Sequence, residues 1–234
     1  MLATERAVLA DSGWRSYLRH GFGSSCVLYY PSIHDDVLDR SGNGNNGTIS
    51  GAIWRRLHNG LWYLSFDGTD DYVLVNPIVP DFDEKSTVSM ECWARISTGC
   101  GENSYIISLP ESAAANGIDL RWGSDTIYWD LNTHLDASSV DVTSAVSLNT
   151  WYHLVLTYDG TTLTGYKNGA SIGSHAVTVG TGLKHDSKRF CVGALHSTSY
   201  EITGFVGLPR IYSEALVATK IQGNFNRERH LFGV

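Results

Sequence analysis

Four polar side chains near the middle of the chain could together bind a sugar. Asp119 and Arg121 alternate with apolar residues in one stretch, and Tyr128 and Asp130 do the same in the next. Because successive side chains of a β-strand point to opposite faces, all four share one face if the apolar residues form the core. An aromatic ring can stack on a sugar while charged groups meet its hydroxyls. We treat these four as candidate ligand-binding residues, although any half-buried sheet shows similar alternation.

Acidic and amide side chains crowd two turns, as a calcium site requires. A calcium ion takes about six to eight oxygen ligands from carboxylates, amides and backbone carbonyls. The first turn offers Asp39 and Asn43, and the second offers Asp67, Asp70 and Asp71. The alternative is that these side chains only form turns by bonding to their own backbone.

Signatures of catalysis are missing from the sequence. It contains no GxxxxGK[ST] phosphate loop, no HExxH motif and no GxSxG nucleophile elbow. A glycoside hydrolase needs two carboxyl groups about 5–9 Å apart, and no predicted strand carries an acidic pair at the same-face spacing of such enzymes. The nearest set, Asp81, Asp83 and Glu84, flanks Pro80 in a predicted loop. The sequence therefore predicts a protein that is not an enzyme, with a glycoside hydrolase as the least favoured alternative.

The composition is that of an ordered protein. The 234 residues are 42% apolar and 18% charged, and the formal net charge is −7. An acidic balance disfavours a general phosphate-binding surface, so no nucleic-acid partner is expected. No apolar run is long enough to insert into a membrane. The first residues carry Glu5 and no basic segment before a long apolar core, so no signal peptide is visible.

Strand and turn signals recur at short intervals along the chain. Asp159-Gly160 and Asn168-Gly169 separate apolar runs, and both dipeptides suit the tight turns that join antiparallel strands. Residues 87–96 alternate between apolar side chains on one face and Glu91, Trp93 and Arg95 on the other. This pattern predicts an all-β sandwich.

The segment around these turns resembles the signature of laminin-G-like domains in the concanavalin A-like jelly-roll superfamily. In that family a Trp-x-His strand leads to a Tyr-Asp-Gly turn and then to a Tyr-x-x-Gly turn, and here these are Trp151–His153, Tyr158–Gly160 and Tyr166–Gly169. The resemblance implies a jelly roll of two stacked antiparallel sheets, with loops that often bind calcium. Many relatives carry an acidic pair where this chain has Gly207 and Leu208, so a ligand supplied there would be lacking.

Further matches to the family follow in order over residues 26–222, which we take as the jelly roll. Residues 1–25 form an N-terminal arm outside it, and residues 223–234 form a C-terminal tail. One short helix is expected near the end of the jelly roll, with Ser213 as its N-cap and Gly223 ending it.

The N-terminal arm carries apolar side chains that need a partner, either the jelly roll itself or another subunit. These residues, the candidate assembly contacts, are Trp14, Tyr17, Leu18 and Phe22.

Two kinds of function fit these expectations. The first is a recognition module that binds a glycan or a surface protein. The second is a structural protein of a large assembly, because laminin-G-like jelly rolls occur in phage minor tail and decoration proteins. Both place the protein outside the cell or on a virion surface. We combine them as an externally displayed adhesion or decoration module.

Overall fold

The computed structural model describes residues 22–32, 34–83, 85, 87–110, 117–133, 136–177, 182–185, 187–196 and 200–234. Three of the predicted assembly contacts, Trp14, Tyr17 and Leu18, lie outside these ranges.

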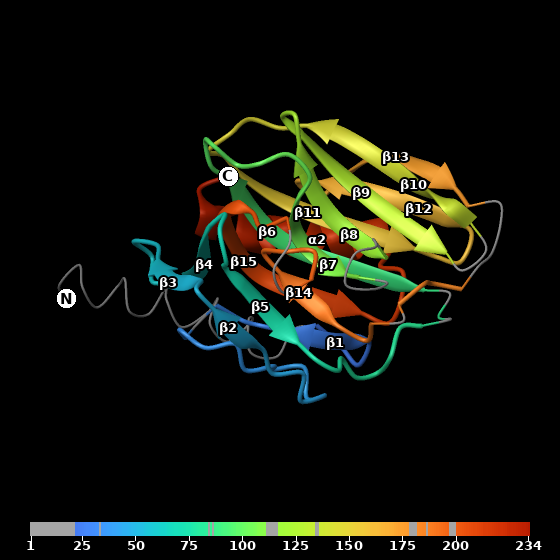
Figure 1. Ribbon diagram of the computed structural model, residues 1–234, viewed down its shortest axis with the longest axis horizontal. Coiled ribbons are helices and arrows are strands. Elements are labelled where there is room, and N and C mark those ends of the chain that lie inside the picture. Colours follow the sequence, from blue (N-terminus) through green and yellow to red (C-terminus); the bar gives the residue numbers. More distant parts are fainter. Residues whose placement is uncertain are drawn as a thin grey trace.

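Two antiparallel sheets stack to form the jelly roll that the sequence predicts (Figure 1). Sheet A has eight strands in the order β13-β12-β11-β6-β15-β4-β3, with β1 also paired to β15. Its strands are β1 (Cys26–Tyr29), β3 (Ile53–Arg56), β4 (Trp62–Asp67), β6 (Val88–Ile96), β11 (Trp151–Tyr158), β12 (Thr162–Lys167), β13 (Ala170–Ala176) and β15 (Thr203–Tyr212).

Sheet B has seven strands in the order β10-β9-β8-β7-β14-β5-β2. Its strands are β2 (Thr48–Ser50), β5 (Tyr72–Val75), β7 (Ser104–Leu109), β8 (Ile118–Gly123), β9 (Thr126–Thr133), β10 (Asp136–Ala145) and β14 (Phe190–Val192).

The predicted hairpins are confirmed. Asn168 and Gly169 both have positive φ and link β12 to β13, with Lys167 paired to Ala170. This is the two-residue loop that the Asn-Gly pair favours. Gly169 also lies against α2 (Ala218–Phe232), because a Cβ at that position would lie 2.9 Å from the Phe225 side chain. The turn therefore closes a hairpin and seats the helix.

The main core lies between the two sheets. The inward residues of β6 are all buried there, as the alternation predicts, and so are the apolar residues of β8 and β9. The other face of β6 is buried as well, because α2 covers it: Trp93 is fully buried in a second core with Phe225 and Phe232. Trp93 and Phe232 stack with ring centres 4.3 Å apart. Sheet A is therefore buried on both sides in this region.

The helix differs from the one that the sequence predicts. It runs from Ala218 to Phe232, with Val217 rather than Ser213 at the N-cap position, and it passes through Gly223. Gly233, in the left-handed conformation, ends it. Burial of its apolar face against sheet A outweighs the roughly 1 kcal/mol that a glycine costs inside a helix. Most of the predicted tail is thus part of α2, and its apolar face belongs to the second core. Within the described ranges, no helix combines the length and the apolar character needed to cross a bilayer.

Candidate functional site

The four predicted ligand-binding residues come together on the outer face of sheet B. Ser124 and Asp125 both have positive φ and form the short turn between β8 and β9. This turn sets the register that places Asp119 opposite Asp130 and Arg121 opposite Tyr128. Across such a pair, directly opposed side chains lie close enough to interact.

Arg121 is the centre of this cluster. Its Nε atom donates a hydrogen bond to Asp130 Oδ2, and its Nη1 atom donates one to Asn103 Oδ1 over 3.0 Å. Its guanidinium carbon lies 4.0 Å from the centre of the Tyr128 ring, close enough for a cation–π interaction. Asn103 is exposed, and Arg121 and Tyr128 are half-buried. We call these three residues the Arg121 surface.

The two aspartates lie beneath this surface and are not part of it. Asp119 is 0% exposed and Asp130 is 1% exposed. Both oxygens of Asp119 and Oδ1 of Asp130 are buried without a hydrogen-bond partner among the described residues. The sequence suggested that both carboxylates would meet a ligand. In the structure Asp130 instead anchors Arg121, and Asp119 lies against Asp130.

Burial makes this acid pair retain protons. Desolvation, and then the neighbouring charge of Asp130, raises the pKa of Asp119 well above its usual value. Desolvation also raises the pKa of Asp130, to about 6, although Arg121 works in the opposite direction. A proton held by the pair removes the repulsion between two adjacent carboxylates.

The acid pair could not be predicted from the spacing of acidic residues along one strand, because it forms across two strands. The turn at Ser124 and Asp125 could have indicated this pair, since a two-residue loop fixes which residues of the two strands lie opposite each other. Both carboxyl groups are enclosed, so in this conformation they offer no attacking group to a substrate.

A second polar cluster, the Arg210 cluster, lies under α2 and consists of Glu91, His153, Arg210 and Glu228. All four are 0% exposed. Arg210 donates two hydrogen bonds to the carboxylate of Glu228, over 2.6 and 2.8 Å. Trp93 Nε1 donates a third over 2.8 Å. Glu228 thus joins the helix to both β15 and β6.

Glu91 is the second anion of this cluster. It accepts hydrogen bonds from His153 Nε2 over 2.7 Å, from the Tyr212 hydroxyl over 3.0 Å and from Asn224 Nδ2 over 3.1 Å. Burial alone would raise the pKa of Glu91, but the positive charge of Arg210 and the bonds from His153 and Asn224 hold it at about 2. Glu91 is therefore ionised, which requires the proton of His153 on Nε2.

The Arg210 cluster has a structural role in which a metal ion does not fit. Ligand atoms of Glu91, His153 and Glu228 lie within 4.8 Å of one another. The Arg210 guanidinium already occupies the centre, bonded to Glu228 and 3.3 Å from Glu91. A second cation there would be repelled.

Phe22, the one predicted assembly contact that the structure describes, is buried against its own chain. Its ring centre lies 4.5 Å from that of Tyr29 and 4.6 Å from the Arg210 guanidinium carbon. It covers the Arg210 cluster from the side of β1.

The first predicted calcium turn is closed by its own hydrogen bonds. Asp39 Oδ1 accepts from the backbone N–H groups of Tyr29 and Ser41, and its Oδ2 accepts from Asn45 N–H and the Ser41 hydroxyl. Asn43 donates its amide to carbonyl groups of β1. Asp39 and Asn43 therefore act as turn formers and fit a calcium site poorly.

The second predicted calcium turn fits better. Ligand atoms of Asp67, Asp70 and Asp71 lie within 4.8 Å of one another. Burial, together with the charges of Asp67 and Asp70, raises the pKa of Asp71. A divalent cation would relieve this repulsion by supplying the opposite charge. These three carboxylates are the residues that would hold a calcium ion.

We predict that calcium stabilises the fold through this turn. A ligand that binds only the folded state adds about 2.7 kcal/mol at a hundredfold excess over its Kd. Thermal melts in millimolar calcium should therefore exceed melts in chelator, and Asp70→Asn should remove the difference. Asp35→Asn, which removes an exposed acid elsewhere, should not. Identical melts with calcium and chelator would remove this site.

The chain matches a known protein family. A family model described as the concanavalin A-like lectin/glucanases superfamily matches residues 67–222. The chain belongs to this superfamily. The match spans β5 to the start of α2, and so it includes the Arg121 surface and most of the Arg210 cluster. Comparison with curated protein sequences finds no match.

Solved structures with the same fold include binding domains of clostridial toxins. The binding domain of Paraclostridial Mosquitocidal Protein 1 gives a TM-score of 0.70 at 16% identity, over 86% of this chain and 52% of that one. The Botulinum Neurotoxin Type G receptor binding domain gives 0.64 at 17% identity, over 87% and 51%. The binding domain of Botulinum neurotoxin DC, in complex with rat synaptotagmin II, gives 0.65 at 19% identity, over 86% and 51%. The chain thus spans about half the length of these domains, and the similarity establishes the fold.

Proposed function

We propose that this protein is a non-catalytic recognition module that binds a glycan at the Arg121 surface. The observation that carries the proposal is the fixed geometry of Arg121, which Asp130 and Asn103 hold against the ring of Tyr128. A side chain held in place before binding loses little conformational freedom when a ligand arrives. The guanidinium can then donate to sugar hydroxyls, and the nearby aromatic groups can stack on the ring.

Other features support this surface over the opposite one. Tyr200 is 54% exposed and packs on Tyr105 with ring centres 6.0 Å apart, which adds an accessible aromatic group beside β7. The outer face of sheet A is covered by α2 along β6 and β11. Structures with this fold are named as binding domains, and one of them is in complex with rat synaptotagmin II. A surface protein is therefore the alternative ligand.

We also propose that the protein acts outside the cell or on a virion surface, where glycans and surface proteins are accessible. A purely structural role in a large assembly is the alternative, and it depends on Trp14, Tyr17 and Leu18, which lie outside the described residues. Phe22, the fourth member of that set, packs within the chain.

The proposal predicts that Arg121 controls binding. A glycan array should yield at least one ligand, and Arg121→Ala should weaken its affinity at least tenfold in a calorimetric titration, because a charge-assisted hydrogen bond contributes about 1.5–3 kcal/mol. Arg121→Lys should restore little of the lost affinity, since the lysine ammonium cannot reproduce the planar set of donors of the guanidinium group. The matched control is Arg55→Ala, which removes an exposed arginine from the edge of sheet A. Full binding by Arg121→Ala would contradict the proposal.

A further inference from the structure

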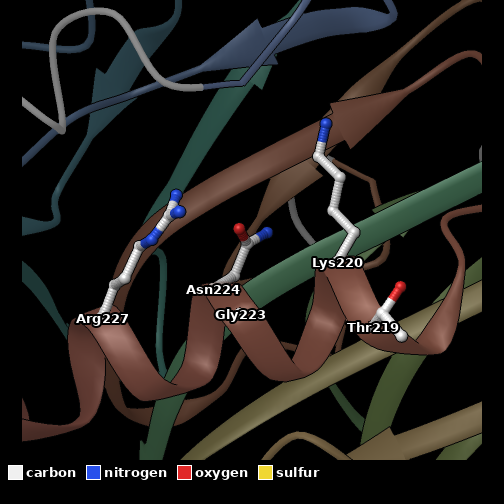
Figure 2. A pocket seen from close by; sticks show the side chains of 5 residues that line it. All are labelled: Thr219, Lys220, Gly223, Asn224 and Arg227. Carbon is white, nitrogen blue, oxygen red and sulfur yellow. The ribbon is translucent and has the colours of Figure 1, made fainter.

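A polar pocket lies on the flank of α2. The helix covers sheet A, whereas the Arg121 surface lies on sheet B. It has a volume of about 260 Å³ and is lined by Thr219, Lys220, Gly223, Asn224 and Arg227. Figure 2 shows the side chains of Lys220, Asn224 and Arg227 rising from the same side of the helix, with Gly223 between them. We call this the α2 pocket.

The floor of the α2 pocket is a glycine that packing does not require. Gly223 lies inside α2, where glycine costs helix stability relative to alanine. Apart from its chain neighbours and the backbone of its own helix, a Cβ at this position would meet no atom within 4 Å, so no packed neighbour excludes a side chain. The missing side chain keeps the pocket open and brings the helix backbone to its surface. Close approach to a ligand is one of the situations in which glycine is used.

The walls of the α2 pocket are cationic in a protein of net charge −7. Lys220 lies one turn before Gly223 and Arg227 one turn after it, so the two positive charges flank the open floor. Lys220 donates a hydrogen bond over 3.2 Å to the carbonyl of Phe22, and an ammonium group has three donors.

Asn224 gives the α2 pocket a rigid side. It is buried, and its amide is held by the carboxylate of Glu91 at 3.1 Å from both oxygens. Glu91 in turn belongs to the Arg210 cluster. The pocket therefore combines a fixed polar wall with two longer cationic side chains, and the two cations suit a small anion.

We propose that the α2 pocket binds the carboxylate of an acidic sugar of the uronic-acid class. This rests on the proposed function, glycan recognition, and adds a second site with a defined ligand class. The carboxylate lies between Lys220 and Arg227, and the sugar ring lies over Gly223 beside Thr219. The volume of about 260 Å³ lies slightly below the range of typical ligand pockets, which starts at about 300 Å³, and so it suits nothing larger than a single sugar residue.

The test compares two sugars that differ only in charge. Methyl β-glucuronide carries the carboxylate, and methyl β-glucoside has a hydroxymethyl group in its place. In titrations followed by NMR chemical shifts, the glucuronide should bind at least tenfold more tightly at low salt. Arg227→Gln should abolish this preference, whereas Arg229→Gln, two residues along the same helix, should keep it. Equal binding of the two sugars, or no binding of either, would overturn the proposal.

A second variant separates loss of the α2 pocket from loss of folding. Gly223→Leu fills the pocket with a residue that favours helix, so the melting temperature should stay the same or rise while glucuronide binding falls at least tenfold. Gln222→Leu places the same side chain on the neighbouring exposed position and should leave binding unchanged. Glucuronide binding that survives in Gly223→Leu would place the ligand elsewhere and refute this site.

The outcome is distinguishable from that of the proposed function. Arg121→Ala should remove binding at the Arg121 surface and leave the glucuronide preference intact, because the two sites lie on opposite sheets. If Arg121→Ala instead removes the glucuronide preference, the acidic sugar binds at the Arg121 surface and the α2 pocket is not its site.

Discussion

Replacing Arg210 with methionine is expected to lower the free energy of unfolding by about 3–5 kcal/mol, the cost of leaving buried charges without their partner. The variant keeps an unbranched apolar stem and removes the guanidinium group with its charge. Glu91 and Glu228, both fully buried, would then lie close together with no guanidinium between them. Urea unfolding followed by circular dichroism measures the change.

A double variant tests whether charge is the cause. Arg210→Met combined with Glu228→Gln removes one buried anion together with the cation, so it should be more stable than Arg210→Met alone. This non-additivity is what a direct interaction produces. If Arg210→Met costs less than about 1 kcal/mol, the cluster does not hold α2 in the way described here.

Asp119→Asn is expected to raise the free energy of unfolding at pH 7.5 and to change it little at pH 4.5, because burial raises the pKa of Asp119 well above its usual value. In the folded state burial raises the pKa of Asp119 and Asp130, the latter from 3.8 to about 6. The folded protein therefore holds protons that the unfolded chain releases. The resulting loss of free energy of unfolding is absent below about pH 4, where both states hold the protons, and it grows as the pH rises toward 6.

Asparagine mimics the protonated form of Asp119 and removes most of this pH dependence. Urea unfolding of wild type and variant at several pH values gives the difference directly, and the contributions of other titrating groups cancel. Asp125→Asn is the matched control, since it removes an exposed charge at a turn position that asparagine also tolerates. A difference that does not vary with pH would show that the acid pair does not hold an extra proton.

The sandwich itself could be predicted from local signals. Asn168-Gly169 and the alternating strands depend on residues close in sequence, and the structure keeps them. The second core could not be predicted in this way. Glu91 and Trp93 alternate with the core residues of β6 and so indicate an exposed face, but α2, more than 120 residues later in the sequence, covers them.

The helix was placed wrongly for a related reason. Gly223 looks like a stop when only propensity is considered, yet Ile221, Phe225 and Phe232 form an apolar stripe that continues past it. Tertiary packing decides the outcome, and the sheet that receives the stripe is not visible in the local sequence. Strand alternation is local, so it could predict that Arg121 and Tyr128 share a face, but it could not predict the contact with Asn103. The burial of Asp119 likewise depends on parts of the chain that alternation does not describe.

The positions of the two ends of the described chain have a practical consequence. Phe22 and Phe232 both belong to the second core, on the side of sheet A that faces α2. The Arg121 surface lies on the other sheet and faces away from them. A sample attached to a sensor chip through the C-terminal end would present the Arg121 surface to the flowing solution and turn the α2 pocket toward the chip. Attachment through a cysteine introduced on β9 would reverse this orientation, so immobilisation alone can assign a ligand to one side of the protein.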